Sequence, residues 1–181
     1  MMYLKSRTNH RLAPNTLDRK PFLNRYAFFY AVVALMAFIF PAFSASAETT
    51  TTTIKKIEES AMDKMLGAKD NRLVVAFMAA WCGPCIQELP ELNRLYEKYM
   101  NQGFSLVGIS IDVEGPQAMQ PIISRMRIGF PIYWYGETAI LKYNLKAIPL
   151  LLFVRQGIII ERLRGKPPTL VLDQKIREFL E

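Results

Sequence analysis

The segment Trp81-Cys82-Gly83-Pro84-Cys85 contains both cysteines of the chain and decides its fold class and its chemistry. It follows a short apolar run over residues 73–78, which is typical of a buried central strand. It precedes a stretch in which leucines and tyrosines recur at helical spacing. The cysteines therefore lie where a strand gives way to a helix, and Gly83-Pro84 suits the helix start because proline is tolerated in the first turn.

Two cysteines at the start of a helix are placed for redox chemistry. Unsatisfied backbone N–H groups and the positive end of the helix dipole stabilise a thiolate at Cys82, which makes it a nucleophile near neutral pH. Cys85 lies one turn later, close enough to resolve a mixed disulfide. A structural disulfide is a weaker alternative, because closing so small a ring contributes little loop entropy. Half of a metal site is the other alternative, and the sequence has no further cysteine to complete such a site.

Outward from the motif, helical and strand patterns alternate along the chain. Helical spacing predicts that the helix beginning at the cysteine motif extends to about residue 99. It predicts further helices over residues 54–66, 118–127, 138–143 and 170–180. Apolar runs predict strands over residues 73–78, 104–111 and 130–133, followed by a hairpin of residues 150–154 and 158–163. This order indicates an α/β domain with a central mixed β-sheet flanked by helices. A core of this size needs no disulfide staple, so the cysteines are free for chemistry.

The first 47 residues have the pattern of an export segment. They carry six basic side chains and one acidic one, and an uncharged apolar run over residues 27–40 follows Arg25. Ala45-Ser46-Ala47 supplies a small-x-small site, so we expect a signal peptide over residues 1–47 with cleavage after Ala47. The alternative is an N-terminal membrane anchor over residues 27–43, which is short for a spanning helix and contains Pro41. Both alternatives place residues 48–181, the expected folded domain, across a membrane.

Export changes the meaning of the basic composition. The formal charge is +7, yet residues 48–181 contribute only 17 basic and 15 acidic side chains, so nothing predicts a nucleic-acid partner. His10, the only histidine, belongs to the export segment. Without it, the exported domain cannot use a Ser-His-Asp or Cys-His nucleophile system, and it lacks the commonest metal ligand.

At residues 81–85 the sequence resembles the thioredoxin superfamily, whose WCGPC signature is present without change. Pro90 matches the proline inside the active-site helix of that family, and Ile148-Pro149 matches its cis-proline. Residues 85–90 and 130–143 resemble the exported TlpA/ResA branch, which carries a central insertion and a glutamate three residues after the second cysteine. The resemblance covers about residues 54–181 and implies a thioredoxin fold with a TlpA/ResA-type central insertion.

Glu88 is the acidic residue that the resemblance singles out. Plain thioredoxins have a buried aspartate on the strand before the motif, and Ala76 occupies the matching position here. We therefore expect Glu88, one turn after Cys85, to accept or donate the proton when Cys85 attacks the mixed disulfide. The alternative is an ordinary solvated carboxylate, which would contribute roughly a few tenths of a kcal/mol through the helix dipole.

The resemblance also implies a substrate-binding groove formed by Trp81, Pro84, Ile148 and Pro149. A cis peptide bond is favourable enough only before proline, and we expect one at Ile148-Pro149. In the family this proline blocks metal capture by the dithiol and leaves the preceding backbone free to pair with an extended substrate. Ile148 and Leu150, where the family often has glycine or threonine, make this groove more apolar. A trans-proline that begins a strand is the alternative.

These residues predict an exported thiol-disulfide oxidoreductase, and the resemblance implies a periplasmic one that reduces disulfides of substrate proteins. Its redox group is the Cys82–Cys85 pair, and we expect no other cofactor and no metal. The resemblance implies cytochrome c maturation or a similar reductive pathway, with a membrane-embedded thiol reductase as electron donor. We expect a monomer.

Three other functions are open to the same residues. A disulfide-forming oxidant is one, although the histidine between the cysteines and the large helical insertion of DsbA-like oxidants are missing. A non-enzymatic metal or copper chaperone is another, and the lack of histidine in the exported domain argues against it. A peroxidase is disfavoured because no peroxidatic-cysteine motif precedes the dithiol.

Overall fold

A computed structural model of the chain describes residues 29–30, 52–70 and 72–181. The chain separates into two units, Met1–Ala47 and Glu48–Glu181. The expected export segment lies almost wholly outside the described residues, so the signal peptide, its cleavage after Ala47 and the anchor alternative stay predictions. Within the described part of the chain, none of the helices has the length and apolar character needed to span a bilayer.

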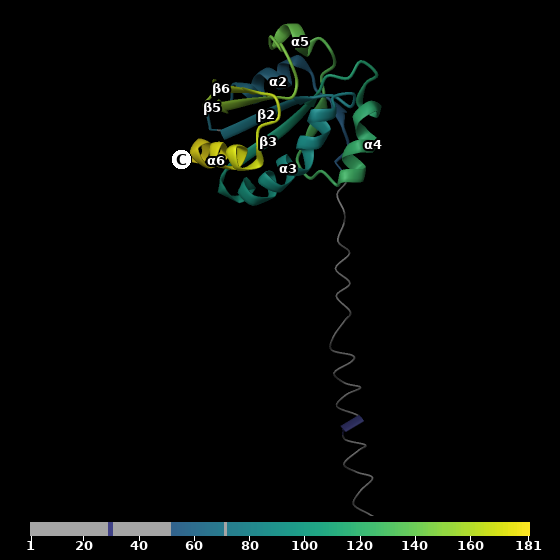
Figure 1. Cartoon of the computed structure of the whole chain (residues 1–181), viewed down its shortest axis with the longest axis vertical. Helices are drawn as coiled ribbons and strands as arrows, with labels where there is room; N and C mark the ends of the chain where they lie inside the picture. The colour runs from purple at the N-terminus through teal and green to yellow at the C-terminus, as the bar shows by residue number, and fades with distance from the viewer. Residues whose placement is uncertain (1–28, 31–51, 71) are drawn as a thin grey trace, which may run out of the picture. The chain divides into compact units, whose positions relative to one another are not determined.

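Six strands form one mixed sheet, whose order across the sheet is β1-β4-β3-β2-β5-β6 (Figure 1). The strands β1, β4, β3 and β2 are parallel, whereas β5 and β6 are each antiparallel to the preceding neighbour. The central strands are almost continuously buried, as expected for a sheet covered on both faces. The bounds are β1 Lys55–Lys56, β2 Arg72–Met78, β3 Phe104–Ser110, β4 Ile132–Trp134, β5 Leu150–Arg155 and β6 Ile158–Arg164.

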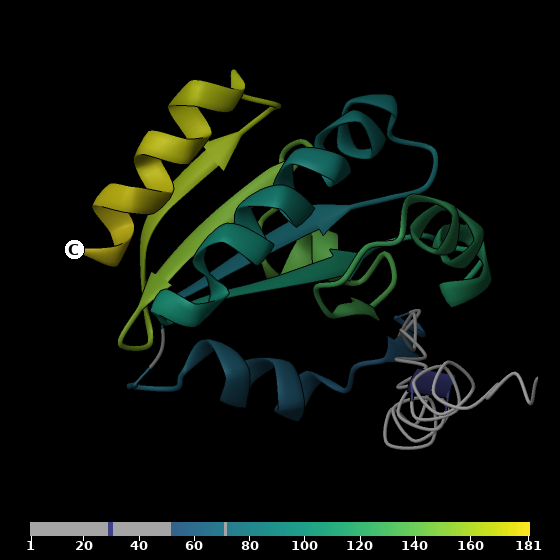
Figure 2. The ribbon, with the colours of Figure 1, turned by 90° about the horizontal axis from the view of Figure 1, so that it is seen from below.

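Helices cover both faces of this sheet. The bounds are α2 Glu59–Leu66, α3 Gly83–Tyr99, α4 Pro116–Met126, α5 Ala139–Lys142 and α6 Thr169–Leu180. On one face lie α3 and α6, which Figure 2 shows nearest the viewer, and α2 and α5 lie on the other (Figures 1 and 2). The hydroxyl of Tyr99 on α3 donates to Asp173 on α6, 3.0 Å away. On the opposite face, Lys142 of α5 bonds to Asp63 of α2 at 3.0 Å.

The predicted α/β class and the final hairpin are confirmed, and most predicted elements agree with the structure to within two residues. The helix predicted from Ile54 is wrong at its start, because α2 begins only at Glu59. The residues before it are extended: Lys55 and Lys56 pair with β4, and the amide of Ile54 donates to Gln120 on α4 at 2.8 Å. Both Ile54 and Ile57 are buried, so their helical spacing reflects burial in an extended segment rather than a helix face.

The topology brings three chain segments to one end of the sheet. The parallel strands β2 and β3 both finish there, and the amide of Ile111 donates to the carbonyl of Met78 at 3.0 Å. Because β5 is antiparallel to β2, with Leu150 opposite Phe77, its first residue begins at the same end. The cysteine motif, the segment after β3 and the residues before β5 therefore meet at this end.

Candidate active site

The two cysteines form a disulfide at the start of α3. The sulfur atoms are 2.08 Å apart and the Cα atoms 5.3 Å apart. Cys82 is the N-cap of the helix, with extended backbone angles, and its Sγ accepts the backbone N–H of Cys85 at 3.3 Å. Its carbonyl accepts the first helical hydrogen bond, from Ile86 at 3.1 Å. The sulfur of Cys82 thus occupies the position where helix N–H groups stabilise a negative charge.

The local sequence explains why the helix begins at this point. Pro84 lies in the first turn, where its missing N–H removes a donor that would have no helical partner. The helix continues through Pro90, which leaves the carbonyl of Ile86 without its usual helical donor. Cys82 and Cys85 are both almost fully buried, whereas the side chain of Trp81 is 65% exposed beside them. The motif thus presents an aromatic surface next to a sheltered disulfide.

Glu88 is buried one turn after Cys85, with only 2% of its surface exposed. Its Oε1 has no hydrogen-bond partner among the described residues. Burial raises the pKa of Glu88 to about 7, and the positive charge of Lys166 offsets part of this rise. The alternative of an ordinary solvated carboxylate is therefore wrong. Ala76, which is also buried, provides no acid on the strand before the motif.

The segment before β5 contains a cis peptide bond between Ile148 and Pro149. Extending the β2–β5 register by one residue places Pro149 opposite Met78, at the same end of the sheet as the motif. The carbonyl of Pro149 accepts the amide of Gly165 at 2.9 Å, which brings the residues around Lys166 to the same end. Ile148 is partly exposed and Pro149 is buried. Trp81, Pro84 and Ile148 thus offer accessible surface at the end of the sheet where the dithiol lies.

Asp112 is the site residue that sequence reasoning missed. It is fully buried after β3, and its two carboxyl oxygens accept the amide of Ala80 at 2.9 and 3.1 Å. The hydroxyl of Ser110 also donates to it, at 2.7 Å. The indole N–H of Trp134 donates to the Asp112 carbonyl at 2.6 Å. The sequence contains one part of the signal, an acid directly after the strand predicted over residues 104–111. Asp112 fixes the backbone two residues before Cys82.

No group of three or more His, Cys, Asp or Glu side chains capable of holding a metal ion occurs among residues 52–70 and 72–181. The polar groups near the dithiol are instead arranged for proton and thiol chemistry. A sulfur at a helix N-terminus can act as a nucleophile, its partner can resolve the product, and a buried carboxyl group with a pKa of about 7 can exchange a proton near neutral pH.

The sequence profile of the AhpC/TSA family matches residues 39–175, about three quarters of the chain. The chain belongs to this family. The family is part of the thioredoxin superfamily, so the resemblance inferred from residues 81–85 is confirmed. Family membership covers both cysteines, Glu88 and the cis-proline segment.

Among curated proteins, the chain is similar to the thiol-disulfide oxidoreductase ResA of Bacillus thuringiensis subsp. konkukian. The two are 24% identical over 113 residues, which cover 61% of this chain and 65% of that protein. It is also similar to the sporulation thiol-disulfide oxidoreductase A of Bacillus subtilis, 23% identical over 62% of this chain and 68% of that protein. The chain thus spans slightly less than two thirds of the length of ResA and slightly more than two thirds of the length of the sporulation oxidoreductase.

Solved structures show the same fold. A putative thiol:disulfide interchange protein DsbE from Chlorobium tepidum matches with a TM-score of 0.57 and 25% identity, over 62% of this chain and 82% of that one. StoA from Bacillus subtilis matches with a TM-score of 0.53 and 23% identity, over 62% and 84% of the two chains. The predicted thioredoxin fold is therefore confirmed.

Proposed function

We propose that this protein is an exported thiol-disulfide oxidoreductase that reduces disulfides of substrate proteins through Cys82 and Cys85. The observation that carries the proposal is the disulfide at the N-terminus of α3, with the Cys82 sulfur accepting a helix N–H and a buried carboxyl group one turn beyond Cys85. The relatives named as thiol-disulfide oxidoreductases support the same activity.

The first step is attack on the substrate by reduced Cys82. Its thiolate forms a bond to one sulfur of the substrate disulfide, and the other substrate sulfur leaves as a thiolate. The product is a mixed disulfide between Cys82 and the substrate. The helix N-terminus favours this step because it stabilises the attacking thiolate. Trp81, Pro84 and the backbone of Ile148 beside cis-Pro149 bind the substrate segment during the attack.

The second step releases the reduced substrate. Cys85 loses its proton to Glu88, and its thiolate attacks the Cys82 sulfur. The Cys82–Cys85 bond forms, the mixed disulfide breaks, and the second substrate thiolate leaves. Two electrons have then passed from the protein to the substrate. A carboxyl group with a pKa near 7 suits this role, because it can take up and release a proton at neutral pH.

The oxidised protein must then be reduced again. We assign this step to a dithiol of a membrane-embedded thiol reductase. One of its thiolates would attack the Cys82–Cys85 disulfide, and its second thiol would resolve the mixed disulfide and leave both cysteines reduced. The likeness to the TlpA/ResA branch supports reduction rather than oxidation, and a role in cytochrome c maturation or a similar pathway. The basic flank and apolar run before Ala47 support export, either as a cleaved protein or as one anchored by residues 27–43.

The test is reduction of insulin disulfides by the purified chain after treatment with a chelator. We expect activity in the wild type and none in Cys82→Ser, with no copper bound to either. Activity lost on chelation, or copper bound in place of activity, would indicate the metal-chaperone alternative. Thiol trapping in cells tests the direction: mostly reduced cysteines support a reductant, and mostly oxidised cysteines contradict it in favour of a disulfide donor.

A further inference from the structure

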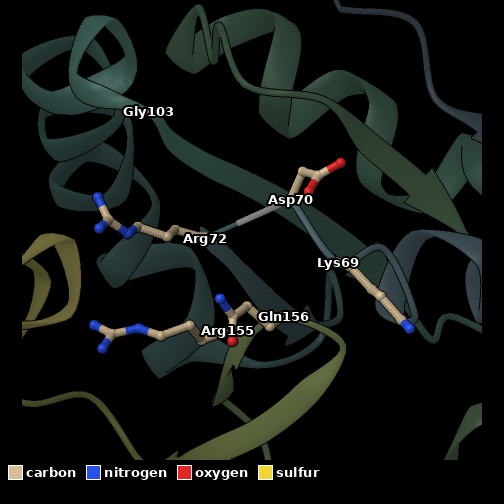
Figure 3. A pocket seen from close by; sticks show the side chains of 6 residues that line it. All are labelled: Lys69, Asp70, Arg72, Gly103, Arg155 and Gln156. Carbon is tan, nitrogen blue, oxygen red and sulfur yellow. The ribbon is translucent and has the colours of Figure 1, made fainter.

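The end of the sheet opposite the dithiol contains an open hollow of about 630 Å³. It lies where β2 begins and β5 finishes, between the α2–β2 connection and the turn of the β5–β6 hairpin. Gly67, directly after α2, packs against Gly157 in the turn of the hairpin, since a Cβ on Gly157 would lie 3.0 Å from the carbonyl oxygen of Gly67. Its lining is mainly polar and basic, as Figure 3 shows: Lys69, Asp70, Arg72, Gly103, Arg155 and Gln156.

Two arginines of this hollow are direct neighbours across the sheet. Arg72 and Arg155 occupy opposite positions in the antiparallel β2–β5 register. Directly opposite residues point to the same face with Cβ atoms about 5 Å apart, and like charges at such positions are destabilising. Figure 3 shows both side chains extending in the same direction, whereas Lys69 and the carboxyl group of Asp70 point elsewhere.

No acidic side chain of the described residues neutralises this pair. None of the ion pairs found within residues 52–70 and 72–181 includes Arg72 or Arg155. Arg155 donates one hydrogen bond to the carbonyl of Phe179, and its guanidinium lies 5.4 Å from the centre of that ring. These contacts hold Arg155 in place, but its buried Nε has no partner among the described residues.

We propose that Arg72 and Arg155 form a binding site for a phosphate-group anion. Two adjacent guanidinium groups match the geometry and charge of a tetrahedral oxyanion, which they bind with charge-assisted, often bidentate hydrogen bonds. Arg155 is already fixed by Phe179, so binding orders mainly Arg72. The exposed amide of Gln156, at the adjacent turn, supplies a further donor. The ligand is either a free phosphate compound or the headgroup of an anionic phospholipid.

The test is thermal unfolding of the full-length chain in a nonionic detergent. Inorganic phosphate and glycerophosphoglycerol, a phospholipid headgroup without acyl chains, are each compared with chloride at equal ionic strength. At ten times the dissociation constant, an anion bound only by the folded state raises Tm by about 5 °C. We expect Arg72→Gln to raise the dissociation constant at least about tenfold, which at the same anion concentration lowers the shift in Tm to about 1.5 °C or less. Arg125→Gln, which removes the same charge from the exposed surface of α4, is expected to retain it.

A response to either anion that depends on Arg72 supports the site, and the anion that gives it identifies the source. A cooperative thermal transition of Arg72→Gln without added anion shows that the variant is folded. The anion response is measured without thiol exchange, so this test and the insulin test of the proposed function succeed or fail separately. A lack of response to both anions, or an undiminished response in Arg72→Gln, would overturn the proposal.

Discussion

The segment after β3 buries a carboxyl group among hydrogen-bond donors, whereas the second turn of α3 buries one whose Oε1 has no donor. Asp112 accepts the amide of Ala80 and the hydroxyl of Ser110. Glu88 is as deeply buried, but its Oε1 has no partner among the described residues, and burial raises its pKa to about 7. Asp112 binds the amide of Ala80, two residues before Cys82, and Glu88 lies three residues after Cys85. The two carboxyl groups therefore act on either side of the cysteine motif.

The difference shows that burial alone does not define the role of an acid. A buried carboxyl group with several donors holds the backbone in one conformation, and losing it leaves those donors unsatisfied. A buried carboxyl group that lacks donors destabilises the folded state when it ionises, and groups with such perturbed pKa values cluster at functional sites. We therefore propose that Asp112 maintains the shape of the site and that Glu88 transfers the proton.

The largest effect is expected from removing the nucleophile that both regions flank. Cys82→Ser should lower insulin reduction by at least about a thousandfold, because a serine hydroxyl cannot replace a thiolate at neutral pH. Cys85→Ser is the matched control. It should retain the first exchange and accumulate a mixed disulfide with the substrate, which mass spectrometry would detect. Accumulation of the mixed disulfide in Cys82→Ser instead would reverse the assignment of the two cysteines.

The next effect is on stability and belongs to Asp112. Asp112→Ala leaves the amide of Ala80 and the hydroxyl of Ser110 without an acceptor, so we expect the free energy of unfolding to fall by about 3 kcal/mol. Urea unfolding measures it. Asp112→Asn keeps one acceptor oxygen and should lose less. If Asp112→Ala were as stable as the wild type, the contrast between the two carboxyl groups would fail.

Glu88 should show the opposite behaviour, as a dependence of stability on pH. Its pKa is about 7 in the folded state against an ordinary value of 4.5, so between these values the folded state binds more protons than the unfolded state. Stability is then greatest below pH 4.5 and falls as the pH rises to 7. The rise in pKa corresponds to a loss of about 3 kcal/mol in the free energy of unfolding between pH 4.5 and 7, and Glu88→Gln should abolish this loss.

Urea unfolding of the oxidised protein from pH 4 to 8 measures this difference, since the disulfide-bonded cysteines do not titrate there. The difference between wild type and Glu88→Gln isolates the one group. Parallel curves for the two proteins would show that Glu88 ionises as an exposed acid.

The smallest effect is expected from Trp81, which is exposed beside the disulfide. Trp81→Ala removes contact surface for the substrate and little packing, so KM should rise about threefold to tenfold with little change in stability. Steady-state kinetics with a disulfide-bonded peptide checks this. Trp81→Phe keeps an aromatic ring and should recover most of the affinity. A change in kcat alone would argue against a role in binding.

The sequence predicted those parts of the site whose residues lie close together in the chain, and it missed those that depend on strand pairing. The placement of the cysteines between strand and helix followed from residues 73–99, and Glu88 from the resemblance, through its position three residues after Cys85. Asp112 was not found, because its role depends on the parallel pairing of β2 and β3, which no local pattern reports. The predicted start of α2 was wrong because it, too, depends on contacts between distant parts of the chain. Lys55 pairs with β4 and the amide of Ile54 donates to Gln120, and these contacts override the helical spacing.

The most direct test of the central claim is the rate at which the mixed disulfide is resolved, followed by stopped flow from pH 5 to 9. The reduced wild type should show an inflection near pH 7 from Glu88, and Glu88→Gln should lose that inflection and resolve the intermediate about a hundredfold more slowly. Attack by Cys82 should be equally fast in both proteins. The same pH profile for resolution in wild type and variant would contradict the account.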